Sequence, residues 1–220
     1  MAEIKGALFD MDGLLLDTET IAQQAFISAT APHGLTRTAA TDAFPYFVGG
    51  NVQTARPRLK RLFPGADTDS IDHAWGRAFE ALIAKGVPTK RTVVETLRAL
   101  ASRGLPMAVV TSSSRAHAEH NLAIAGIREF FEGLVSGTDV SNRKPNAEPY
   151  LRGAALLGLA PGACAAFEDS DPGITAAVAA GCVATQIPDI RPPGVAFPAL
   201  GQRHATTLAE AVTALGLLAD

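Results

Sequence analysis

Two aspartates, Asp10 and Asp12, lie one residue apart at the end of an apolar run and are followed by Gly13. Each carboxylate raises the cost of ionising the other, so this placement suggests a function. Asp10 could attack phosphorus and form an aspartyl-phosphate that water later cleaves. Asp12 could protonate the leaving oxygen and then activate that water. Gly13 leaves no side chain where the backbone must turn sharply beside a ligand.

Polar residues also follow the later apolar runs. They are Thr111, Ser112 and Ser113, then Lys144, then Glu168 and Asp169. Ligands of parallel sheets bind at the carboxyl ends of the strands, so we expect all these side chains in one crevice with the two aspartates. Four carboxylates would repel one another unless a divalent cation lay between them. Mg²⁺ fits best, because no Cys or His lies at these strand ends.

The same set predicts a phosphoryl site. The backbone N–H groups of Met11 and Asp12 and the hydroxyl of Thr111 or Ser112 would hold phosphate oxygens, with Ser113 in the same hydroxyl run. Lys144 would add positive charge that screens the nucleophile from its anionic substrate.

Short apolar runs predict the strands that position these residues. We expect strands at 4–9, 105–110, 133–137, 163–167 and 182–187. Segments with helical periodicity separate the later runs, at 92–103, 115–126, 147–158 and 171–180. This alternation predicts an α/β fold with a doubly wound parallel sheet.

One interval breaks the alternation. About 75 residues, 17–91, have helical periodicity and almost no strand pattern, which is too long for an unstructured loop. We therefore expect an inserted helical domain at 17–88 and an α/β core domain formed by 1–16 and 89–220. Pro88 prevents a continuous helix in the returning linker.

Composition narrows the range of partners. The net charge of −3 gives no broad basic surface, which argues against nucleic acid as a partner. Cys164 and Cys182 lie in apolar surroundings and are expected to be buried core residues. There is no secretory signal pattern and no apolar run near the ~20 residues of a membrane span. We expect a cytoplasmic protein without a membrane partner, as a monomer or weak homodimer.

Four motifs occur in a characteristic order: "FDMDGLLLDTE", "VVTSSS", "RKP" and "FEDSDPGI". Across essentially the whole chain they resemble the haloacid dehalogenase superfamily, specifically its phosphatase and phosphomutase branch with a helical cap. The resemblance implies that Asp10 is nucleophile and metal ligand, and that Asp12 is the acid–base group and offers its backbone carbonyl to the metal. It implies that Lys144 steadies phosphate. It also implies that Asp169 binds Mg²⁺ directly and that Glu168 binds it directly or through water.

Departures from the family pattern help to choose a branch. Haloacid dehalogenases proper and phosphonate-cleaving members lack an acid at the position of Asp12, which favours phosphate esters here. β-Phosphoglucomutases have a histidine and a cap-loop arginine where this chain has Ala22 and Val52. Arg143 replaces the usual glycine before the motif lysine. Relatives with a shorter turn place the phosphate-binding hydroxyl at Ser112 and those with a longer turn at Thr111; we favour Ser112.

The sequence thus predicts a Mg²⁺-dependent phosphatase of a small phosphorylated metabolite, a sugar phosphate above all. A β-phosphoglucomutase-like phosphomutase is the alternative, and a non-catalytic or receiver-like signalling domain is a remote one. The candidate residues also have structural interpretations: Glu168 and Asp169 could cap the helix expected near Asp171. The hydroxyl run from Thr111 to Ser114 could likewise cap the helix from Arg115, and Lys144 could be an exposed loop residue.

Overall fold

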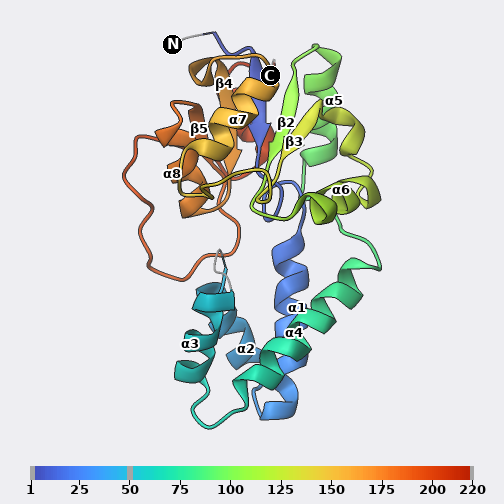
Figure 1. Cartoon of the computed structure of the whole chain (residues 1–220), viewed down its shortest axis with the longest axis vertical. Coiled ribbons are helices and arrows are strands. Elements are labelled where there is room, and N and C mark those ends of the chain that lie inside the picture. Colours follow the sequence, from blue (N-terminus) through green and yellow to red (C-terminus); the bar gives the residue numbers. More distant parts are fainter. Residues whose placement is uncertain (1–2, 49–51, 219–220) are drawn as a thin grey trace. The chain divides into compact units, whose positions relative to one another are not determined.

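The computed structural model describes residues 3–48 and 52–218. The chain forms two compact units. The first consists of Met1–Asp17, Pro88–Asp189 and Ala196–Asp220, and the second of Thr18–Val87 and Ile190–Val195. Figure 1 labels their helices and strands.

The first unit contains a six-stranded sheet in the order β3-β2-β1-β4-β5-β6. Its strands are β1 (Gly6–Phe9), β2 (Met107–Val110), β3 (Gly133–Val135), β4 (Cys164–Glu168), β5 (Val183–Gln186) and β6 (Arg203–His204). All neighbouring strands are parallel. The predicted α/β fold with a parallel sheet is confirmed, and β6 is a strand that the apolar pattern did not predict.

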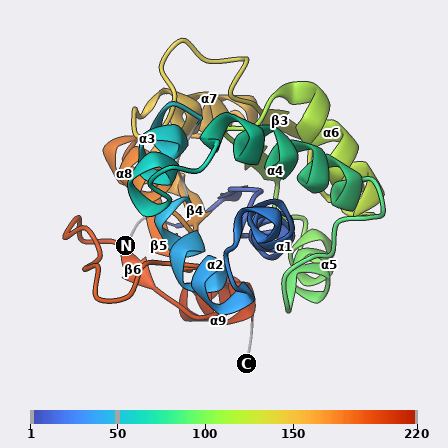
Figure 2. The ribbon, with the colours of Figure 1, turned by 90° about the horizontal axis from the view of Figure 1, so that it is seen from below.

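Helices cover both faces of this sheet. They are α5 (Val93–Ser102), α6 (Arg115–Ile124), α7 (Glu148–Leu156), α8 (Asp171–Ala179) and α9 (Leu208–Ala214). Figure 2 shows α7 and α8 on one side of the strands and α5 and α9 on the other. Leu8 and Val110 from the strands pack with Tyr150 of α7 and Ile174 of α8 in one buried cluster. Because both faces are buried, the central strands are continuous apolar runs rather than alternating ones.

The second unit is helical. It contains α1 (Thr18–Thr30), α2 (Arg37–Ala43), α3 (Val52–Leu62) and α4 (Thr68–Ile83), with 3₁₀ turns at Ala31–His33 and Phe44–Tyr46. Phe26, Phe44 and Phe47 form its aromatic centre, and the Phe26 and Trp75 ring centroids are 5.0 Å apart. Ala22 packs against this cluster; the side chain of Val52 lies outside the described residues. The helical unit thus has an apolar core of its own.

The segment Ile190–Val195 belongs to the helical unit, whereas the sequence pattern places it in the core domain. Ile190 packs against the aromatic cluster of that unit. The sequence here, "IRPPGV", has neither strand alternation nor helical periodicity. The segment is placed in the helical unit only by a tertiary contact, and sequence periodicity cannot predict such a contact.

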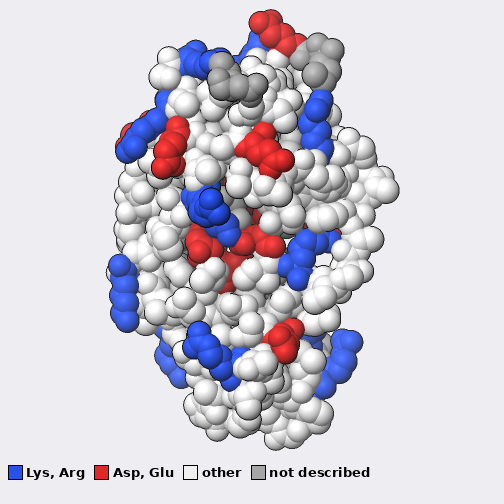
Figure 3. All heavy atoms as spheres, turned by 180° about the vertical axis from the view of Figure 1, so that it is seen from behind, with Lys and Arg blue, Asp and Glu red and all other residues white. Residues whose placement is uncertain are grey.

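Charged side chains of both signs are mixed on the face drawn in Figure 3, where lysines and arginines stand apart with acidic residues among them. Within the described part of the chain, none of the helices combines the length and apolar character needed to cross a bilayer. Both cysteines are free; Cys164 is buried and Cys182 half-buried.

Candidate active site

The sheet order brings the predicted residues together. β1 lies between β2 and β4, so Asp10, Thr111 and Glu168 all lie at the same edge, and Asp169 follows directly. The N–H of Asp10 donates to the carbonyl oxygen of Phe167 at 3.0 Å, which continues the pairing of β1 and β4 by one residue. This hydrogen bond holds the backbone of Asp10 in place, and so orients its side chain.

Three carboxylates form a buried cluster. Ligand atoms of Asp10, Glu168 and Asp169 all lie within 4.8 Å of one another, and all three residues are buried. Burial raises the pKa of Asp10, while the charge of Lys144 acts in the opposite direction. A set of three oxygen donors without sulfur or imidazole fits a hard divalent cation, which would offset their repulsion.

Lys144 is the internal counter-charge of this cluster. Its Nζ donates to Oδ1 of Asp10 at 2.5 Å, to Oε1 of Glu168 at 2.5 Å and to the carbonyl oxygen of Val110 at 2.8 Å. Only 4 % of its side chain is exposed. Burial alone would lower the pKa of Lys144, but the charges of Asp10 and Glu168 raise it above its usual value. Lys144 is therefore a permanent cation, and its interpretation as an exposed loop lysine is wrong.

Glu168 is held from several sides. Tyr150 Oη donates to its Oε1 at 2.8 Å, and Ser170 donates to its Oε2 from the hydroxyl at 3.1 Å and from the backbone at 3.3 Å. Burial, followed by the charge of Glu168, raises the pKa of Tyr150, so the phenol stays protonated as a donor. A Cβ at Gly173 would lie only 1.9 Å from Oε1 of Glu168, so α8 can approach this carboxylate only with glycine there.

Tyr150 and Gly173 are parts of the site that the sequence did not predict. Tyr150 lies on the apolar face of a periodic segment, so its pattern is that of a core residue. Gly173 lies in the first turn of α8. The sequence around these two residues does not indicate that they lie beside Glu168. The contact arises only because α7 and α8 pack on β4.

Asp12 and the hydroxyl run are linked. Ser113 Oγ donates to Oδ2 of Asp12 at 2.8 Å, a contact that the sequence did not predict. The Oγ1 of buried Thr111 accepts from the N–H of Ser113 at 3.1 Å, whereas Ser112 is exposed. Thr111 therefore shapes the loop and Ser113 positions Asp12, while the preference for Ser112 as the phosphate contact stays a prediction.

The turn after β1 leaves two backbone donors open. Leu16 N–H donates to Met11 O at 3.0 Å, and Gly13 N–H to Leu16 O at 3.0 Å. Across the described ranges, the N–H groups of Met11 and Asp12 make no backbone hydrogen bond. Gly13 has φ +83°, and a Cβ there would lie 2.4 Å from Oδ2 of Asp169. The turn therefore requires glycine, and two N–H groups remain available for ligand oxygens.

Serines cap the two neighbouring helices, and Ser114 is the member of the hydroxyl run that caps α6, as predicted. Ser114 Oγ accepts from the N–H of His117 at the start of α6, and Ser170 Oγ accepts from the N–H of Gly173 at the start of α8. The capping interpretation of Glu168 and Asp169 is therefore wrong, because Ser170 is the residue at that position of the helix.

The loop that carries Lys144 is fastened by Glu148. Its carboxylate accepts from the N–H groups of Ser141 at 3.0 Å and Asn142 at 2.9 Å, and pairs with Arg152 at 2.8 Å. These bonds, that from the Ser141 N–H above all, lower the pKa of Glu148 to about 2. The ionised carboxylate therefore joins residues 141–142, before Lys144, to the start of α7, after Lys144.

Replacing Glu148 with glutamine should therefore lower the free energy of unfolding near neutral pH. This loss of stability should be clearly smaller at pH about 3. A carboxyl whose pKa falls from 4.5 to about 2 on folding stabilises the protein above pH 4.5, and this contribution is lost as the pH falls toward 2. Urea denaturation of both proteins at the two pH values measures the difference. The control variant Arg152→Met keeps the hydrogen bonds from the Ser141 and Asn142 N–H groups to Glu148. At neutral pH it should lower the free energy of unfolding less than Glu148→Gln does. A Glu148→Gln effect independent of pH would contradict this account.

The chain is similar to proteins that are named as phosphatases. The chain is 34 % identical over 182 residues to hexitol phosphatase A of Escherichia coli, covering 81 % of this chain and 80 % of that protein. It is 33 % identical over 186 residues to the fructose-1-phosphate phosphatase YqaB of E. coli, covering 83 % and 95 %.

A crystal structure of a haloacid dehalogenase family hydrolase from Deinococcus radiodurans, with bound phosphate and sodium, superimposes with a TM-score of 0.84. That protein shares 30 % sequence identity, and the match covers 100 % of this chain and 99 % of the other. The family model of haloacid dehalogenase-like hydrolases matches residues 4–181. The resemblance of the motifs is confirmed, and the chain belongs to the haloacid dehalogenase-like hydrolases.

Proposed function

We propose that this protein is a Mg²⁺-dependent phosphatase that hydrolyses a small phosphorylated metabolite, a sugar phosphate, through an aspartyl-phosphate on Asp10. The observation that carries the proposal is the buried Asp10 carboxylate, which lies within a cluster of three acids and accepts a hydrogen bond from Lys144. The relatives named as phosphatases of hexitol and fructose phosphates support the substrate class.

The chemistry divides between the two aspartates. Asp10 attacks phosphorus, the ester P–O bond breaks, and the leaving alcohol oxygen takes a proton from Asp12. In the second half, Asp12 takes a proton from water, whose oxygen attacks the same phosphorus and releases inorganic phosphate from Asp10. Ser113 keeps the Asp12 carboxyl in place through its hydrogen bond.

The remaining residues bind the phosphoryl group and the cation. The N–H groups of Met11 and Asp12, the hydroxyl of Thr111 or Ser112, and Lys144 would hold phosphate oxygens. The O–H of Ser113, which we also expected near the phosphate, is already donated to Asp12. Asp10, Glu168, Asp169 and the backbone carbonyl of Asp12 would hold Mg²⁺. When bound, the cation supplies positive charge to the transferring phosphoryl oxygens.

A panel of phosphorylated sugars and sugar alcohols tests the proposal. With Mg²⁺ we expect release of inorganic phosphate from at least one member, and with excess chelator we expect the release to stop. Absence of metal-dependent release from every member would contradict a phosphatase. Interconversion of a hexose 1-phosphate that requires a bisphosphate primer and releases no phosphate would establish the phosphomutase instead. The cytoplasmic location and the monomeric or weakly dimeric state stay predictions.

A further inference from the structure

Asp189 is a partly buried acid outside the predicted site. It follows β5, and 10 % of its side chain is exposed. Its Oδ1 accepts from Nζ of Lys90 at 2.5 Å, whereas its Oδ2 is buried and has no hydrogen-bond partner in the described part of the chain. A buried acceptor without a donor costs free energy, so a donor is expected there when the enzyme is loaded.

The unpartnered oxygen points to the same small region as Asp169. A Cβ built on Gly13 would lie 2.4 Å from Oδ2 of Asp169 and 3.5 Å from Oδ2 of Asp189. Because Gly13 has no side chain, nothing from this residue separates the two carboxylates. Asp189 thus lies beside the acidic cluster, yet it is not one of the three acids whose oxygens lie within 4.8 Å of one another.

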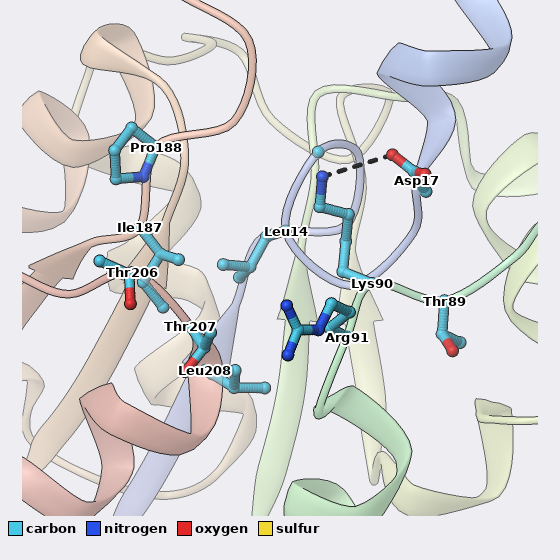
Figure 4. Close-up of a pocket in the computed structure, with 11 residues that line it drawn as sticks. Leu14, Asp17, Thr89, Lys90, Arg91, Ile187, Pro188, Thr206, Thr207 and Leu208 are labelled. Carbon is cyan, nitrogen blue, oxygen red and sulfur yellow. Dashed lines mark hydrogen bonds and ion pairs between the residues drawn. The ribbon is translucent and has the colours of Figure 1, made fainter.

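Lys90 fixes the orientation of Asp189. Its Nζ also pairs with Oδ1 of Asp17 at 3.3 Å, as the dashed line in Figure 4 shows. The backbone N–H of Lys90 donates to the carbonyl oxygen of Leu15 at 3.0 Å, which ties it to the turn after β1. Lys90 and Asp17 line a cavity of about 360 Å³ next to Gly13. Lys90 therefore engages one oxygen of Asp189 and leaves the other directed toward the turn.

We propose that Asp189 is an outer-sphere ligand of the cation, with its Oδ2 accepting a hydrogen bond from a water molecule bound to the metal at Asp10, Glu168 and Asp169. Mg²⁺ in proteins usually keeps several of its waters, and each such water needs an acceptor. Carboxylates that accept from the metal's first shell strengthen binding. Lys90 is the positioning residue. This inference rests on the proposed function, because it requires the cation.

Binding of Mn²⁺ to the metal-free protein, measured from the free-ion EPR signal, tests the inference without turnover. Asp189→Asn should weaken Mn²⁺ binding about tenfold or more. Asp17→Asn is the matched control: it removes the same charge from the same lysine, but at an oxygen that has its partner, and Kd should stay within about twofold. Circular dichroism verifies that each variant folds, and Asp189→Ser replaces Asp189→Asn if that variant does not.

Unchanged Mn²⁺ binding in the folded Asp189 variant would overturn the inference, as would equal weakening in both variants, which would indicate a general charge effect around Lys90. Failure of the proposed function looks different, because the unsubstituted protein itself would then bind no Mn²⁺. Selective weakening in the Asp189 variant alone is the result that the inference predicts.

Discussion

Replacing Asp10 with asparagine should reduce phosphate release by about 10⁴-fold or more, because the amide cannot form the bond to phosphorus. The substitution preserves the shape of a buried side chain whose backbone is fixed by β4. It also removes a negative charge from a buried cluster, so the fold should persist. Steady-state phosphate release at saturating substrate and Mg²⁺ measures the loss.

A control separates lost chemistry from lost structure. Glu119→Gln removes a carboxylate on α6 that pairs with Arg128 at the surface, and it should leave the rate unchanged. Circular dichroism and calorimetric titration with substrate should show that the Asp10→Asn protein is folded and still binds. A folded variant that keeps more than a tenth of the activity would remove Asp10 from the mechanism.

Replacing Lys144 with methionine should lower the free energy of unfolding of the metal-free protein by about 3–5 kcal/mol. Asp10 and Glu168 would then share a buried space without their counter-charge, since 4 % of the Lys144 side chain and 0 % of the Glu168 side chain are exposed. Phosphate release should fall as well, because the lysine also contacts Asp10, the proposed nucleophile. Urea denaturation with chelator present measures the stability change.

Lys90→Met is the matched control for this effect. Lys90 also binds two carboxylates, but its side chain is 29 % exposed and that of Asp17 is 28 % exposed, so water can replace the lysine at Asp17. Only Asp189, 10 % exposed, is left mostly buried. The loss of Lys90 should therefore lower the free energy of unfolding clearly less than the loss of Lys144 does. In a second test, Asp10→Asn added to Lys144→Met should recover part of the lost stability. Equal losses for both lysines, or no recovery in the double variant, would contradict the role of Lys144 as a buried counter-charge.

The strands and the strand-end residues could be predicted because both are local properties of the sequence. A fully buried parallel strand must be apolar, and the first polar residue after it must lie at the sheet edge. β6 could not be predicted, because a strand of two exposed residues, Arg203 and His204, has no apolar run. Its strand character comes only from pairing with β5.

Contacts between distant segments could not be predicted in the same way. The pairing of Lys90 with Asp189 and of Ser113 with Asp12 joins residues about a hundred positions apart. No periodicity encodes such pairs, because they depend on how the turns after β1, β2 and β5 lie at one sheet edge. The polar residues of the motifs could thus be predicted as the site, whereas their supporting partners are apparent only from the fold.

Chemical trapping of the covalent intermediate tests the central claim most directly. The enzyme is mixed with its best substrate and Mg²⁺, quenched in acid within milliseconds, treated with borohydride and digested for mass spectrometry. We expect reduction of an acyl phosphate at Asp10 alone, and no such product in the Asp10→Asn protein. Rapid phosphate release with no trapped product at Asp10 would show that water attacks the substrate directly, and would contradict the aspartyl-phosphate mechanism.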